Sequence, residues 1–217
     1  MQATASRRTQ CNFEFFDDHV PRKLQNALLR SVFENYAEAS RYCWRNFATP
    51  QAKDLSGTYR RARIEEEWSG IATLFPRDVT VEVRPYENNT GYYNEITCGR
   101  VVITQSCIVD PNEVPRTALF RTTLARSGQL ELFDAIEDTD ADDLLYTILT
   151  HGVDVTSRRR SRPGFAKFQF PNRDCSKYVD DGIDLFKRFP DIVNEYLTDV
   201  TAEVEPKRRR FPKKGTA

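Results

Sequence analysis

The stretch at residues 79–109, VTVEVRPYENNTGYYNEITCGRVVITQSCIV, decides the fold. Its first five residues alternate Val with Thr or Glu, and this period of two is typical of a half-buried strand. The run Asn-Asn-Thr-Gly that begins at Asn88 favours a turn, because Asn and Gly accept positive φ. Residues 92–98 and 100–109 follow as two more strands on either side of Gly99. The stretch therefore predicts an antiparallel three-stranded meander.

Two helical patterns precede the meander. Over residues 21–47, apolar side chains recur every three or four positions, which is typical of one buried helix face. Residues 51–75 repeat the spacing, and Pro76 ends it. Gly57 and Gly70 interrupt this second pattern, so it is either one helix or two.

The second half of the chain is more irregular. Residues 115–143 are interpreted as an exposed connection, although the part before residue 129 could also form a short helix. Two further strands are expected at 144–150 and 165–170, followed by a helix near 183–197 that is broken or kinked at Pro190.

These patterns predict the α+β class, with N-terminal helices packed on an antiparallel sheet of about five strands and a C-terminal helix. A single domain is expected at residues 13–200. Residues 1–12 are expected to be a disordered N-terminus, and residues 201–217 a charged, disordered tail.

Composition narrows the class of protein. Of 217 residues, 32 are Lys or Arg and 32 are Asp or Glu, so the chain has no net positive charge that would attract nucleic acid. The five cysteines form no CxxC pair and are odd in number, which indicates reduced thiols in a cytosol. The sequence has no apolar run of about 18 residues to span a membrane and no apolar signal-peptide core. A cytoplasmic protein without membrane contact is therefore expected.

Catalytic motifs are absent from the sequence. It contains two histidines, His19 and His151, and no HExxH, P-loop, GxSxG or GxGxxG motif. His151 follows a predicted strand and precedes Gly152, and is interpreted as a turn histidine. We therefore expect no metal, no cofactor and no enzymatic activity.

One enzymatic alternative stays open. A helix followed by a meander that bears Asp78, Glu82 and Glu95 is similar to the core of restriction-endonuclease-like nucleases. That resemblance implies a divalent metal held between acidic groups, with a lysine nearby. The chain departs from the pattern, because no lysine lies between Lys53 and Lys167, and Ile and Thr follow Glu95 where the family has an acidic-x-Lys triplet.

Basic clusters offer weak contacts to DNA. Arg158, Arg159, Arg160 and Arg162 are candidate phosphate contacts, and the tail adds a second basic cluster. Neither cluster is interleaved with aromatic residues that would stack on bases. A solvated loop and tail are favoured, with weak, non-specific DNA attraction.

The most specific motif is Gln129-Leu130-Glu131-Leu132-Phe133, which Gly128 precedes and an acidic run follows. It resembles the peptide by which bacterial replication and repair proteins bind the DNA polymerase sliding clamp, a Gln and a Leu followed by Ser, Asp or Glu and then Leu-Phe. The resemblance implies that Gln129 hydrogen-bonds at the pocket rim, that Leu132 and Phe133 enter an apolar pocket, and that Leu130 packs beside them. Residues 182–186 match only in part, and core packing is favoured there.

A small chain with a clamp peptide and no catalytic motif resembles the SocB family of replication-blocking toxins. That resemblance implies that the protein competes with polymerase for the clamp, and that an antitoxin acts as a protease adaptor and delivers it to ClpXP. Three hypotheses stay open: a clamp-binding toxin, a clamp-recruited enzyme such as a nuclease, and an interaction protein in which residues 129–133 belong to the core.

Overall fold

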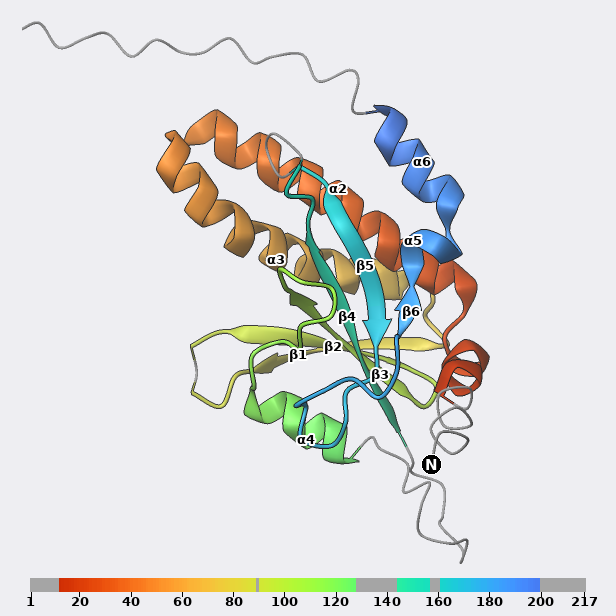
Figure 1. The fold of residues 1–217 in the computed structure, drawn as a ribbon. Coiled ribbons are helices and arrows are strands. Elements are labelled where there is room, and N and C mark those ends of the chain that lie inside the picture. Colours follow the sequence, from red (N-terminus) through yellow and green to blue (C-terminus); the bar gives the residue numbers. More distant parts are fainter. Residues whose placement is uncertain (1–11, 89, 128–143, 157–160, 200–217) are drawn as a thin grey trace, which may run out of the picture.

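The computed structural model describes residues 12–88, 90–127, 144–156 and 161–199. Residues 12–19 are helical. The elements that follow in chain order are α2 (Arg22–Asn46), α3 (Thr49–Thr73), β1 (Val79–Pro85), β2 (Tyr92–Cys98), β3 (Val101–Cys107), α4 (Leu119–Ser127), β4 (Leu145–Val153), β5 (Pro163–Gln169), β6 (Ile183–Asp184), α5 (Leu185–Arg188) and α6 (Pro190–Asp199) (Figure 1).

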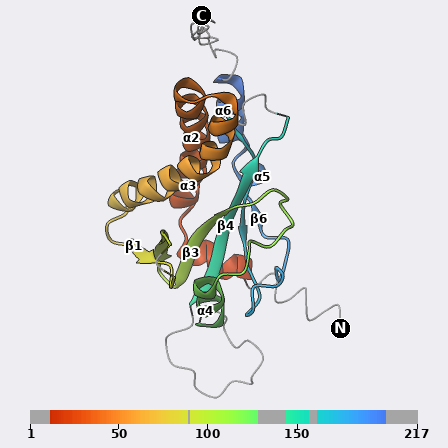
Figure 2. The ribbon, with the colours of Figure 1, turned by 90° about the vertical axis from the view of Figure 1, so that its left-hand side faces the viewer.

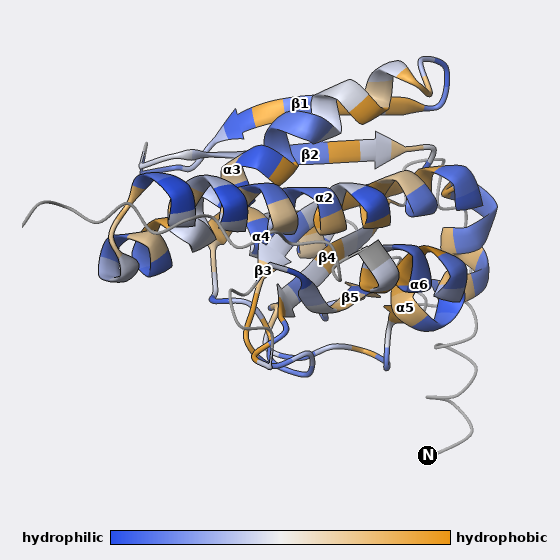
Figure 3. Ribbon diagram, turned by 90° about the horizontal axis from the view of Figure 1, so that it is seen from above, coloured by the Kyte–Doolittle hydropathy of each residue, from blue (hydrophilic) through white to orange (hydrophobic). Residues whose placement is uncertain are grey.

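The two long helices pack against each other and cover one face of the sheet (Figure 1). The α2 helix buries a stripe that includes Leu24, Leu28, Val32 and Tyr36, as its apolar spacing predicts. Helix α3 is continuous over 25 residues. Its two glycines therefore lie inside one helix, which answers the question that the sequence leaves open. Figure 3 shows how hydrophilic and hydrophobic residues alternate along both helices.

The sheet has six strands in the order β1-β2-β3-β4-β5-β6. All neighbours are antiparallel except β3 and β4, which are parallel. The predicted α+β class is confirmed, with N-terminal helices on a mostly antiparallel sheet and helices at the C-terminal end. The parallel pair differs from the expected antiparallel sheet. It requires a crossover connection, and α4 is part of that crossover.

Helix α4 lies on the face of the sheet opposite α2 and α3 (Figure 2). Side chains alternate along each strand, so Val101 and Ile103 join the core beneath the long helices, whereas Val102 packs with Ala125 of α4. Residues 115–143 are therefore not an exposed connection throughout, because Phe120 and Ala125 of α4 are buried.

The C-terminal part also differs in detail from its pattern. The helix expected near 183–197 is the short strand β6 followed by α5 and α6, and Pro190 is the first residue of α6. Asp184 caps α5 by accepting hydrogen bonds from two backbone N–H groups. Ile183 and Leu185 are buried, which confirms that residues 182–186 are a core segment.

Across the described ranges, no helix combines the length and the apolar character that crossing a membrane requires.

Two kinds of glycine give a direct test of this packing. A Cβ atom at Gly152 of β4 would lie 2.4 Å from the carbonyl oxygen of Ile108 and 2.4 Å from Phe165 Cε1, whereas at Gly57 it would meet nothing within 4 Å. We expect Gly152→Ala to lower the free energy of unfolding by about 1–3 kcal/mol through overpacking. Gly57→Ala should raise it by about 0.5–1 kcal/mol, because Ala favours the helix. Urea denaturation measures both, and a loss of stability in Gly57→Ala would contradict a continuous α3.

Candidate functional site

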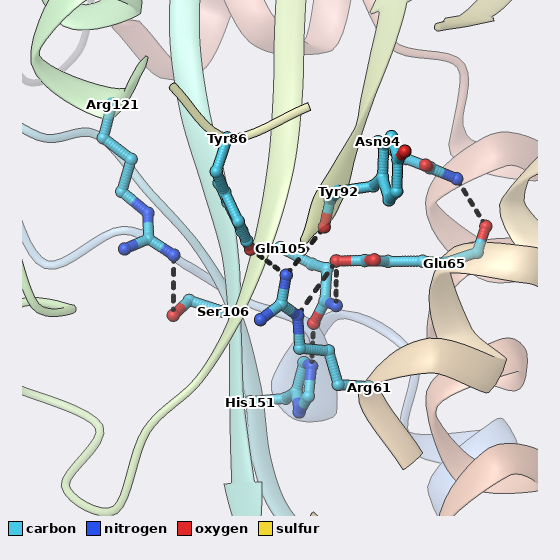
Figure 4. A network of polar contacts seen from close by, with 9 residues as sticks. All are labelled: Arg61, Glu65, Tyr86, Tyr92, Asn94, Gln105, Ser106, Arg121 and His151. Carbon is cyan, nitrogen blue, oxygen red and sulfur yellow. Dashed lines mark hydrogen bonds and ion pairs between the residues drawn. The ribbon is translucent and has the colours of Figure 1, made fainter. Parts of the chain in front are cut away.

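A chain of buried polar side chains joins the long helices to the sheet, and Figure 4 shows most of it. Tyr36 Oη of α2 lies 2.8 Å from His151 Nδ1 of β4. His151 Nε2 lies 2.8 Å from Gln105 Oε1 of β3, and Gln105 Nε2 lies 3.0 Å from Glu65 Oε1 of α3. Tyr36 and His151 have no solvent exposure, and Gln105 is 7% exposed. Four residues from four elements thus form one hydrogen-bonded relay, which we call the Tyr36–Glu65 relay.

The relay has one consistent direction of donation. The Glu65 carboxylate accepts from the amide of Gln105, which leaves the amide oxygen of Gln105 to accept from His151 Nε2–H. Burial, aided by the positive charge of Arg60, lowers the pKa of His151 to about 3. The imidazole is therefore neutral at pH 7, and its Nδ1 accepts from the Tyr36 hydroxyl. Each buried donor in the relay has an acceptor.

The relay lies where strands β2 and β3 no longer pair with each other. Strands β2 and β3 are seven residues long, yet they pair only over the three partners from Ile96↔Ile103 to Cys98↔Val101. Beyond those pairs, Asn94 is paired with Val83 of β1 but has no partner in β3, and its Nδ2 donates to the backbone oxygen of Glu65 at 2.6 Å. Gln105 also lies in this unpaired part of β3. The side chains of Asn94 and Gln105 thus reach from this part of the sheet to Glu65 of α3.

An arginine closes the relay at its outer end. Arg61 forms an ion pair with Glu65, Nε to Oε1 at 3.2 Å, and it also donates to the Tyr86 hydroxyl and to the backbone oxygen of Tyr92. Burial raises the pKa of Glu65, and the charge of Arg61 offsets part of that increase. The Glu65 carboxylate thus lies between the neutral amide of Gln105 and the guanidinium of Arg61, whose side chain is 40% exposed.

The structure corrects the interpretation of His151. It is not a turn residue, because β4 continues to Val153 and His151 lies inside this strand with its ring buried. The apolar spacing of residues 21–47 places Tyr36 in the core, and the strand pattern of residues 100–109 gives Gln105 no functional role. The available signal was the polar Gln105 two positions after the core residue Ile103, since a polar side chain on a buried strand face needs partners.

Two of the three acidic residues of the nuclease alternative, Glu82 and Glu95, contact the same cation, Arg84. Glu82 and Glu95 are direct partners across β1 and β2. Arg84 lies 2.5 Å from Glu82 through Nη2 and 3.0 Å from Glu95 through Nε, and Tyr93 donates to Glu95 at 3.0 Å. Asp78 is exposed in the turn before β1. Within the described ranges, no three His, Cys, Asp or Glu side chains gather as a metal site would require.

The other predicted site residues fall largely outside the described ranges. These are the clamp motif at residues 129–133 and Arg158, Arg159 and Arg160. Arg162 is described, and its Nε lies 2.7 Å from Asp154 Oδ2. The guanidinium of this candidate phosphate contact is therefore already paired within the protein.

Comparisons with known proteins return no relative for this chain. No family model matches it, and neither does any curated protein or solved structure.

Removing one hydroxyl tests the relay. Tyr36→Phe keeps the ring beneath Arg60, whose guanidinium lies 3.9 Å from the ring centroid, but it leaves His151 Nδ1 without its donor. We expect the free energy of unfolding to fall by about 1–3 kcal/mol, the cost of an unsatisfied buried acceptor. The control Tyr59→Phe removes a hydroxyl that donates to Glu38 at the surface, and it should change stability by less than about 0.5 kcal/mol. Equal effects in denaturant titrations would contradict the relay.

The buried histidine predicts a pH dependence. Because the pKa of His151 is lowered to about 3 in the folded state, from about 6.5 in the unfolded chain, only the unfolded state gains its proton between these values. The contribution to stability is complete above pH 6.5 and declines as the pH falls, by up to about 1.4 kcal/mol per pH unit. His151→Gln should lack this component between pH 6.5 and 5, as urea unfolding at several pH values would reveal. Parallel pH profiles of the two proteins would refute it.

Proposed function

We propose that this protein binds the bacterial DNA polymerase sliding clamp through residues 129–133 and blocks replication by competing with polymerase and other clients. One observation carries the proposal: the five residues Gln-Leu-Glu-Leu-Phe match the clamp-binding pattern and lie between two described elements. Helix α4 ends at Ser127 and β4 begins at Leu145. The motif thus belongs to the crossover that links the parallel strands β3 and β4.

Packing of the described residues supports an outward role for the motif. The long helices cover one face of the sheet with a continuous apolar core. On the other face, Ala125 of α4 packs with Val102, Tyr146, Ile148 and Cys175. Both faces therefore have apolar cover from described elements, which favours a partner pocket over the protein's own core as the place for Leu132 and Phe133.

The expected affinity follows from the side chains. Burying Leu130, Leu132 and Phe133 would contribute roughly 5–8 kcal/mol. Ordering a peptide of this length offsets a good part of that gain. A micromolar dissociation constant is the net expectation, so effective competition with polymerase requires further contacts or a second site.

Competition for a pocket needs no chemical step. The Arg84 guanidinium between Glu82 and Glu95 also favours this function over a clamp-recruited nuclease, because the pair is already compensated by a positive charge. As part of the same proposal, the protein is a cytoplasmic toxin that an antitoxin, acting as a protease adaptor, delivers to ClpXP. DNA contributes only weak, non-specific attraction.

Substitutions within the motif test the proposal with a matched control. Gln129→Ala and Phe133→Ala should each weaken binding of purified clamp by about tenfold or more, and should relieve growth arrest. Glu131→Ser keeps the pattern, which accepts Ser, Asp or Glu at that position, and should bind like wild type. Binding is measured by titration of labelled clamp, with a thermal melt of every variant.

Two results would redirect the proposal. If Phe133→Ala lowers the melting temperature by several degrees and leaves clamp binding unchanged, the segment belongs to the protein's own core. If the protein cleaves DNA in the presence of Mg²⁺ and Glu95→Gln abolishes the cleavage, the enzymatic alternative replaces the inhibitor.

A further inference from the structure

A second arginine, Arg121 of α4, contacts the part of β3 that does not pair with β2, and no acidic residue of the described ranges forms an ion pair with it. Arg121 of α4 donates from Nη1 to the backbone oxygen of Arg116 at 2.8 Å and from Nη2 to Ser106 Oγ of β3 at 3.2 Å. Its Nε is buried and has no hydrogen-bond partner. No carboxylate in the described part of the chain forms an ion pair with it. Burial lowers the pKa of Arg121, as expected of a cation held away from water.

Arg61 brings a second guanidinium to the same place from the opposite layer. Figure 4 shows Arg121 and Arg61 reaching toward the end of β3, with Tyr86 and Ser106 near them. The charge of Arg61 adds to the lowering of the Arg121 pKa, so the two cations interact unfavourably. Glu65 is the nearby carboxylate, and Arg61 and Gln105 already bind it. Two positive charges therefore face one negative charge that is already engaged.

Such an arrangement is costly unless an anion completes it. A buried charge without a counterion is unfavourable in general, because it loses hydration and gains no compensating charge. Four donor groups lie around the position, two guanidiniums and the hydroxyls of Ser106 and Tyr86, while the Glu65 carboxylate is held by Arg61 and Gln105. Guanidinium forks match the spacing of tetrahedral oxyanions, and a phosphate has enough oxygens and charge to accept from both at once.

We propose that Arg61, Arg121, Ser106 and Tyr86 form a binding site for an oxyanion of the phosphate class. The site is distinct from the clamp motif and from the arginine-rich loop at residues 158–162. It uses three elements, α3, α4 and β3, together with the residue that follows β1, at the point where β2 and β3 stop pairing. It does not depend on the proposed clamp binding.

The alternative role for Arg121 is purely structural, as a brace between α4 and Ser106. The two roles differ in their response to ligand. A brace contributes the same stability in chloride as in phosphate, whereas a binding site adds stability only when the anion is present. Inorganic phosphate, titrated against chloride at constant ionic strength, is therefore the probe.

The test compares two arginines of one helix. Arg121→Gln removes the charge and retains hydrogen-bonding groups, and Arg126→Gln makes the same charge change at an exposed position of α4. We expect phosphate to raise the melting temperature of wild type and of Arg126→Gln, with similar affinities by calorimetry. In Arg121→Gln the affinity should fall by about tenfold or more, as expected for a lost charged hydrogen bond.

A second variant and a second ligand complete the experiment. If Arg121→Gln does not fold, Tyr86→Phe, which removes only the hydroxyl, should weaken phosphate binding severalfold. Weaker binding of a single-stranded oligonucleotide by the same variants would identify a phosphodiester as the source, and an effect on inorganic phosphate alone would identify a small phosphate ligand. Phosphate responses that are equal in wild type, Arg121→Gln and Tyr86→Phe would overturn the proposal.

Discussion

The parallel pairing of β3 with β4 is the constraint on which the rest of the structure depends. Its register aligns Cys107 with His151 and Gln105 with Leu149, and so brings His151 within hydrogen-bonding distance of Gln105. Two parallel strands cannot be joined by a tight turn, so the chain has to cross the sheet between them. That crossover contains α4, with Arg121, and then the clamp motif. An antiparallel pair with a short hairpin would have neither the relay nor room for the motif.

The central polar groups of the Tyr36–Glu65 relay are neutral, and charged groups lie around them. The relay interior consists of a phenol, an imidazole and an amide, which together bury no net charge. Two charged groups lie beside it: Glu65, which pairs with the partly exposed Arg61, and Arg60, which is 3% exposed and lies over the Tyr36 ring. Glu82 and Glu95 likewise meet Arg84 at the half-exposed edge of the sheet. Arg121 differs from Arg61 and Arg84, because no carboxylate of the described residues pairs with it, and the proposed anion site rests on that difference.

Local patterns in the sequence were sufficient for the fold class but not for the site. Alternating valines predicted β1, and the apolar stripe predicted α2, because both signals depend on neighbours within one element. The direction of β4 relative to β3 leaves no such trace, since a strand has the same pattern in either direction. His151 precedes Gly152, and this pair predicts a turn after the strand. In the structure both residues lie inside β4, and the His151 ring is buried with partners from α2 and β3. The Tyr36–Glu65 relay joins residues up to 115 positions apart, so no local spacing could have revealed it.

The two proposed sites rest on different interactions and are separable for that reason. The anion site depends on charge in a partly buried setting, so its affinity should decline as salt competes for and screens the guanidiniums. The clamp motif depends chiefly on apolar side chains, whose burial is insensitive to moderate ionic strength. Arg121 donates to Ser106 of β3 and to the backbone oxygen of Arg116, which precedes α4. The motif begins beyond Ser127, so substitutions within it remove no contact that the structure describes for Arg121.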